Sequence, residues 1–143
     1  MCDASRFYVD ALDSDDGYEV IRFMADNLIK EGIVKESAYQ GIVERENIAS
    51  SVYGSFAFPH DIRLSAKETT LSIYISSKPL NFNNEQIRAI FLFTINAKNH
   101  LSTYRSALEA IYNNLEKKTF KKKVLNCKTI EAFTELIIAN HSS

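Results

Sequence analysis

The run Ile-Arg-Ala-Ile-Phe-Leu-Phe-Thr-Ile at residues 87–95 constrains the fold more than any other feature of this sequence. It is almost continuously apolar and rich in β-branched and aromatic residues, which predicts a central strand that is buried on both faces. Such a strand needs a neighbour along each edge and a covering layer on each face. The rest of the chain must therefore supply more strands, and helices for both sides of a sheet.

The remaining periodicities supply those elements. Residues 69–77 alternate apolar and polar, which is typical of a strand with one face in the core, residues 52–58 read as another strand, and residues 5–12 read as a short first strand or an extended lead-in. Helical spacing predicts helices in five segments: 17–31, 37–46, 101–115, 119–126 and 129–139. The predicted class is α/β (α+β): a three-layer sandwich in which a small mixed β-sheet is flanked by helices on both faces.

The first helix has signals at both ends. Asp16 and Glu19 have the spacing of a capping box, and Gly32 follows the last apolar residue of the pattern.

Length and composition exclude several classes of protein. With 143 residues, 45% of them hydrophobic, we expect residues 1–143 to form a single domain, with residues 1–5 either disordered or left over from cloning. The 17 basic and 18 acidic residues give a net charge of -1, so we expect no direct nucleic-acid binding. No apolar stretch approaches the roughly 18 residues of a membrane span. We therefore expect a cytoplasmic protein without membrane insertion, whose two cysteines stay reduced.

His60 is the first candidate for chemistry. It follows Phe-Ala-Phe-Pro at the end of a predicted strand, where a side chain leaves the packed core and meets solvent. Pro59 stiffens the backbone that enters His60, so the imidazole is presented with little conformational freedom. A surface histidine with no function is the alternative explanation.

A second histidine strengthens the functional interpretation. His100 comes directly after the buried strand at 87–95, so the two imidazoles share one edge of the sheet if their strands are parallel neighbours. Arg45, Ser50 and Ser51 precede the strand that leads to His60 and could close around the same edge. Glu44 and Glu46 could hydrogen-bond a histidine or the arginine, with solvation at a helix end as the alternative. No His-rich metal-binding spacing is present, so we expect no metal and no cofactor.

Two histidines, one arginine and hydroxyl groups suit a phosphoryl group. A neutral imidazole nitrogen can attack phosphorus in line, while the guanidinium and the second imidazole share the charge on the equatorial oxygens.

Four segments then carry a family resemblance: Val-Glu-Arg-Glu-Asn at 43–47, Ala-Phe-Pro-His at 57–60, Ser-Lys-Pro-Leu-Asn-Phe at 77–82 and Phe-Leu-Phe-Thr-Ile-Asn-Ala-Lys-Asn-His-Leu at 91–101. In this order they resemble the EIIA domains of the mannitol/fructose class (EIIA type 2) of the bacterial phosphoenolpyruvate-dependent sugar phosphotransferase system (PTS). The resemblance spans nearly the whole chain.

The resemblance implies a phosphotransferase component that relays phosphate. Such domains accept phosphate from the histidine of the carrier protein HPr and pass it to an EIIB domain. His60 matches the phosphoryl acceptor, usually modified on Nε2, while His100 and Arg45 match the other catalytic residues. Ser50, Ser51 and Glu44 are expected in a phosphoryl-binding or supporting role. The resemblance also implies a mixed sheet between helices.

Two departures leave the role open. Asp61 stands where many relatives have a small residue, and a carboxylate there would repel a phosphorylated imidazole unless it turns away or binds a cation. The segment at 77–82 resembles the EIIA-like domains of sugar-responsive transcription regulators and antiterminators, whereas His100 favours a working carrier. A carrier for sugar transport, a regulatory domain controlled by phosphorylation of His60, and a non-catalytic interaction module therefore all stand. The sequence fixes neither the sugar nor the oligomeric state.

Overall fold

A five-stranded mixed sheet organises the molecule, with strands in the order β1-β4-β5-β3-β2. The structure is a computed structural model that describes residues 3–61, 63, 65–96 and 109–141. Its elements are β1 (Asp3–Val9), α1 (Gly17–Lys30), α2 (Ala38–Ile48), β2 (Val52–Tyr53), β3 (Phe56–Ala57), β4 (Ser65–Phe82), β5 (Glu85–Asn96), α4 (Lys118–Asn126) and α5 (Ile130–His141). Residues 109–112 are also helical, and the rest of the helix predicted over 101–115 lies outside the described residues.

The central strand is the one that the sequence predicts. β5 occupies the middle of the sheet, antiparallel to β4 and parallel to β3, while β1 runs parallel to β4 at one edge. Consecutive β5 side chains enter different cores: Phe91 and Phe93 belong to one cluster of buried residues, and Ile90 and Leu92 belong to the other.

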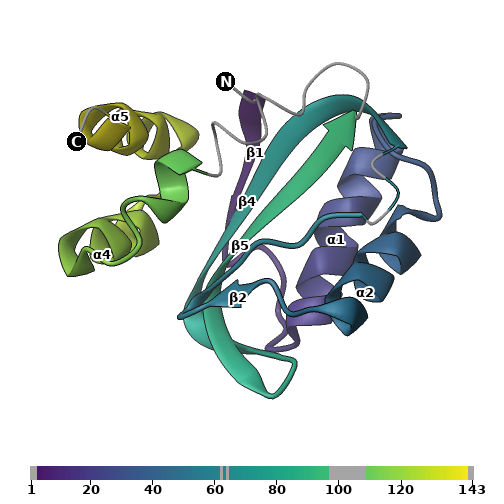
Figure 1. The fold of residues 1–143 in the computed structure, drawn as a ribbon, viewed down its shortest axis with the longest axis horizontal. Coiled ribbons are helices and arrows are strands. Elements are labelled where there is room, and N and C mark those ends of the chain that lie inside the picture. Colours follow the sequence, from purple (N-terminus) through teal and green to yellow (C-terminus); the bar gives the residue numbers. More distant parts are fainter. Residues whose placement is uncertain (1–2, 62, 64, 97–108, 142–143) are drawn as a thin grey trace.

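Helices cover both faces of the sheet, as Figure 1 shows. α1 and α2 lie on one face, where Val20, Met24 and Ile42 are buried. α4 and α5 lie on the other, where Phe120 and Phe133 are buried. The predicted three-layer α/β sandwich is confirmed. No helix in the described part of the chain is long and apolar enough to cross a membrane.

The strands depart from their predicted bounds in three places. The segment over 52–58 is not one strand but a hairpin, because β2 turns into β3 at Gly54, whose φ is +61°. β4 extends beyond Ser77 to Phe82, past a break in register between Ile75 and Leu80 that accommodates Pro79. β4 is also buried on both faces, since Ser72 and Tyr74 are each 1% exposed.

The start of β1 and the N-terminal cap of α1 differ from the prediction, whereas the end of α1 agrees with it. β1 begins at Asp3, which pairs with Thr70 of β4, so the first strand starts two residues before its predicted beginning at residue 5. The capping box is incomplete, because the Asp16 side chain accepts from the backbone N–H of Tyr18 but Glu19 binds the Ser14 hydroxyl. At the other end of α1, Gly32 has a φ of +76° and its N–H donates to the carbonyl of Ile29, as predicted for a helix stop.

Candidate functional site

His60 lies where the sequence places it, at the carboxyl end of β3. Beyond β3 the chain continues beside β5: the N–H of Phe93 donates to the carbonyl of Pro59 at 3.1 Å, and His60 forms a parallel bridge with Phe93. Phe58 and Pro59 are buried, and His60 is half-buried. The imidazole therefore sits at the boundary between the core and solvent, on backbone that is paired to the central strand.

The strands that precede His60 and His100 are parallel neighbours, which is the condition for both histidines to lie at one edge of the sheet. β3 and β5 are parallel neighbours, with Phe56 opposite Ala89 and Ala57 opposite Ile90. Their carboxyl ends therefore point to the same edge of the sheet. His100 itself lies outside the described residues, as does everything between residues 97 and 108.

Arg45 acts electrostatically on His60. It lies in the last turn of α2, where its Nη1 donates to the carbonyl of Ala49 at 2.9 Å, an interaction that also suits the negative end of the helix. Burial lowers the pKa of the His60 imidazole, and the guanidinium of Arg45 lowers it further. Asp61 and the backbone of Phe58 oppose this shift without reversing it. The lower pKa favours the neutral imidazole, which has a lone pair available for nucleophilic attack.

The two serines support the backbone that carries His60. The Ser51 hydroxyl and the Ser51 carbonyl both accept from the N–H of Phe58, at 3.1 and 3.2 Å, two residues before His60. The Ser50 hydroxyl accepts from the N–H of Val52 at the start of β2. Both side chains therefore hold the hairpin that leads to the histidine.

The carboxylate that belongs to this scaffold is Glu46, not Glu44. Glu44 is exposed, and its contact is with Gln40, one turn earlier in α2. Glu46 is only 4% exposed, and its Oε1 accepts from the N–H of Ser51 at 3.0 Å. Glu46 stands four residues after the buried Ile42, so helical spacing places it on the buried face of α2 and could have singled it out.

The described residues offer no metal centre. Across 3–61, 63, 65–96 and 109–141, no group of three or more histidine, cysteine, aspartate or glutamate side chains is arranged to hold a metal ion. Among the described residues, Arg45 and Asp61 are charged groups that act on His60.

Fold and site together define a three-layer α/β domain with a half-buried histidine at the carboxyl edge of a mixed sheet. The family model for the phosphoenolpyruvate-dependent sugar phosphotransferase system, EIIA 2, matches residues 3–140, and the chain belongs to this family.

Solved structures of the mannitol class share the fold. The complex of enzyme IIA-mannitol with phosphorylated enzyme IIB-mannitol from Escherichia coli matches with a TM-score of 0.76 and 18% identity, over 97% of this chain and 98% of the other. The crystal structure of IIA mannitol from Escherichia coli matches with a TM-score of 0.73 and 18% identity, over 93% and 96% of the two chains.

A curated relative has a different role. The "Probable licABCH operon regulator" of Bacillus subtilis is 20% identical over 119 residues, which are 82% of this chain and 18% of the regulator. The chain thus spans less than a fifth of the length of the curated relative that it matches.

Proposed function

We propose that this domain is a phosphoryl carrier of the sugar phosphotransferase system, which accepts phosphate from HPr on His60 and passes it to an EIIB domain. The observation that carries the proposal is the half-buried imidazole of His60 at a strand end, whose pKa is lowered by burial and by the charge of Arg45, in a chain of the EIIA 2 family. A neutral imidazole is the nucleophilic form, and a fixed cation next to it suits the charge of a phosphoryl group.

The transfer step exchanges one phosphorus–nitrogen bond for another. The lone pair of a His60 ring nitrogen attacks phosphorus in line with the phosphohistidine of HPr. The old P–N bond breaks, and its electron pair returns to the HPr imidazole, which takes up a proton. His60 releases the proton of its other ring nitrogen, so no net proton is consumed. Onward transfer to EIIB reverses the role of His60, which then becomes the leaving group.

The neighbouring residues have separate tasks in this proposal. Arg45 stabilises the charge on the equatorial oxygens during transfer, and we assign the same task to His100 on the basis of the sequence. Ser50, Ser51 and Glu46 keep the acceptor segment in place through the hydrogen bonds of the hairpin. Preorganisation of this kind matters because a misplacement of about 1 Å can cost a reaction about 100-fold in rate.

A regulatory role is the second candidate, and the match to the licABCH operon regulator favours it. In that case His60 takes up phosphate by the same chemistry, and the phosphorylated domain controls the activity of a larger regulator. The two roles differ in what happens after phosphorylation: a carrier hands the group to EIIB, whereas a regulatory domain retains it while its contacts change.

Phosphorylation in vitro tests the shared chemistry. The protein is incubated with labelled phosphoenolpyruvate, the general PTS kinase and HPr, and acid-labile label is measured. We expect wild type and the control His141→Ala to be labelled, and His60→Ala to remain unlabelled. Undiminished label on His60→Ala would remove His60 from the acceptor position. An unlabelled wild type would leave only a non-catalytic interaction module.

A chase separates the two candidates. The labelled protein is freed of HPr and mixed with purified mannitol-class and fructose-class EIIB domains. Loss of label from His60 with matching gain on EIIB supports the carrier. Retention of label with every EIIB domain, despite efficient labelling by HPr, supports the regulatory domain.

A further inference from the structure

Asp61 follows the acceptor histidine and is fixed in place by Arg63. The Asp61 carboxylate accepts from the backbone N–H of Arg63 at 3.0 Å, and its Oδ1 lies 3.5 Å from Nε of the Arg63 guanidinium. Nη2 of the same guanidinium donates to the carbonyl of Ser37 at 2.7 Å, at the start of α2. The Asp61 side chain is 17% exposed, so this ion pair is partly shielded from water. Through the bond to Ser37, the ion pair is anchored to the start of α2.

α2 has a gap in its side chains where Asp61 packs. Gly41 faces the carboxylate so closely that a Cβ atom there would collide with Oδ1 and Cγ of Asp61, and would lie 2.8 Å from Nη2 of Arg63. The absence of a side chain at Gly41 therefore lets the ion pair approach the helix backbone. Because the approach is this close, the carboxylate stays at a defined position beside His60.

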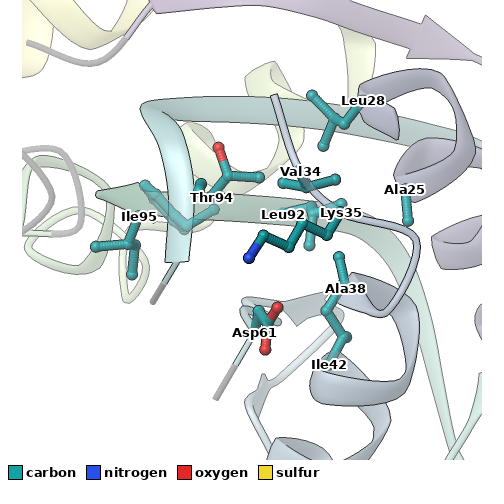
Figure 2. Close-up of a pocket in the computed structure, with 12 residues that line it drawn as sticks. Ala25, Leu28, Val34, Lys35, Ala38, Ile42, Asp61, Leu92, Thr94 and Ile95 are labelled. Atoms are coloured by element: carbon teal, nitrogen blue, oxygen red, sulfur yellow. The ribbon is translucent and has the colours of Figure 1, made fainter. Parts of the chain in front are cut away.

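Two cationic side chains, Lys35 and Arg63, lie near the Asp61 carboxylate, and the charge of Asp61 also affects the pKa of His60. Figure 2 shows Asp61 and Lys35 on the wall of one small cavity between α1, α2 and β5, with a volume of about 20 Å³. Arg63 is the cation that contacts Asp61 directly. The charge of Arg45 lowers the pKa of the His60 imidazole, and the charge of Asp61 raises it. The Asp61 carboxylate therefore acts on the imidazole even though it is paired with Arg63.

We infer that the Asp61–Arg63 pair sets the phosphoryl-transfer potential of His60, a role that rests on the proposed function. A phosphoryl group brings a charge of about −1.5 to −2 to the imidazole. The Asp61 carboxylate repels that charge and destabilises the phosphohistidine relative to the free histidine, which favours passing the group on. Arg63 moderates the repulsion by partly neutralising Asp61. The transfer itself is the exchange of P–N bonds described above, with no added reactant.

The two members of the pair give variants with opposite expected effects. Purified phospho-HPr is mixed with each variant, and the label is partitioned between the two proteins at equilibrium. We expect Asp61→Asn to shift the partition towards His60 by about threefold to tenfold, because an adjacent negative charge is removed. Arg63→Gln should shift it towards HPr by a similar factor, because Asp61 is then unneutralised. Arg63→Lys keeps the charge and should stay near wild type.

Asp15→Asn is the matched control for the loss of one negative charge. Asp15 is exposed, and its carbonyl binds the N–H of Asn81 near the start of the β4–β5 turn, whereas His60 pairs with Phe93 near the other end of β5. We expect its partition to equal that of wild type.

A titration of the unphosphorylated proteins by NMR gives a second readout. The pKa of His60 should fall in Asp61→Asn and rise in Arg63→Gln, which loss of packing alone would not produce. Equal partition in Asp61→Asn and Asp15→Asn, or a shift in the same direction for Asp61→Asn and Arg63→Gln, would overturn the inference while leaving the carrier function intact. An unlabelled wild type would overturn the proposed function and this inference with it.

Discussion

At the scale of single residues, the protonation state of His60 decides whether the site can react. Burial and then the guanidinium of Arg45 lower its pKa from the ordinary 6.5. At a given pH near or below 6.5, a larger fraction of His60 is therefore neutral than of an exposed histidine. Acceptance of phosphate should accordingly remain possible under mildly acidic conditions, because the nucleophilic lone pair persists.

The first prediction follows from that shift. We expect the midpoint of the His60 ring titration, followed by NMR, to lie below 6.5, and to rise towards 6.5 in Arg45→Gln. The unfolded chain takes up its proton near pH 6.5, before the folded chain does. The contribution of His60 to stability is therefore complete above pH 6.5 and is lost as the pH falls through the folded pKa. A midpoint at or above 6.5 in wild type would contradict this account.

At the scale of elements, α2 contacts the chain on both sides of His60. Its buried Glu46 holds Ser51, which in turn holds the N–H of Phe58 before His60. Its Gly41 leaves space for Asp61 after His60. The helix therefore fixes the backbone on both flanks of the reactive residue, although it contributes only Arg45 to the field around the imidazole.

The element-scale prediction uses the sign of a helix substitution. Alanine in place of glycine inside a helix normally stabilises a protein by about 0.5–1 kcal/mol. We expect Gly41→Ala to destabilise instead, because the new Cβ would displace the Asp61 carboxylate and disturb its ion pair. Urea unfolding measures the free-energy change, and Asp61→Ala supplies the background in which the collision is gone.

In that background Gly41→Ala should recover its usual stabilising sign, apart from the adjustment required of the flexible end of Arg63. A stabilising effect of Gly41→Ala in wild type would show that Asp61 is not held against α2 as described.

Some elements of the fold are predicted correctly from the sequence, and others are not. The continuous apolar run predicts β5 and its central position, and the end signals predict both ends of α1, because burial on two faces and helix caps leave local signatures. The β2–β3 hairpin is not predicted from the sequence, because Tyr53-Gly54-Ser55-Phe56 has strand-like residues on both sides of one glycine. Only the pairing of β2 with β3 in the structure reveals the turn.

Some features of the candidate site can likewise be proposed from the sequence, and others appear only in the structure. Residue type and order propose His60 and Arg45 as site residues, and the structure gives an electrostatic effect of Arg45 on His60. The charged run Glu-Arg-Glu brings up both Glu44 and Glu46, and only the burial of Glu46 in the structure separates the two carboxylates. The Gly41 contact with Asp61 joins positions twenty residues apart and leaves no local pattern.

At the scale of the whole molecule, the site depends on layers that it does not touch. Phe58, two residues before His60, stacks on Phe91 of β5 with ring centroids 5.2 Å apart. Phe91 in turn packs against Phe133 of α5 at 6.0 Å, and Phe133 also contacts Phe7 of β1 at 6.2 Å. Through these rings α5 contacts β1 and β5, and through Phe91 it is linked to Phe58, two residues before His60.

Phe133→Ala tests whether this layer is needed for folding. Phe133 is 3% exposed, so truncation removes its burial and leaves a cavity between α5 and the sheet, with an expected loss of about 3–5 kcal/mol in the free energy of unfolding. Ile138→Ala in the same helix is the matched control. Its side chain is 63% exposed, and its loss should change stability by less than about 0.5 kcal/mol.

Both substitutions keep the helix propensity of α5 high, so a difference between them reports tertiary packing. Urea unfolding provides the two free energies, and the His60 ring signal in the folded state shows whether the damage reaches the site. Because the rings form a continuous contact from α5 to Phe58, we expect the His60 signal to move in Phe133→Ala and to stay fixed in Ile138→Ala. Equal stability of the two variants would mean that α5 rests on the sheet without stabilising it, and that the two-layer remainder is the true folding unit.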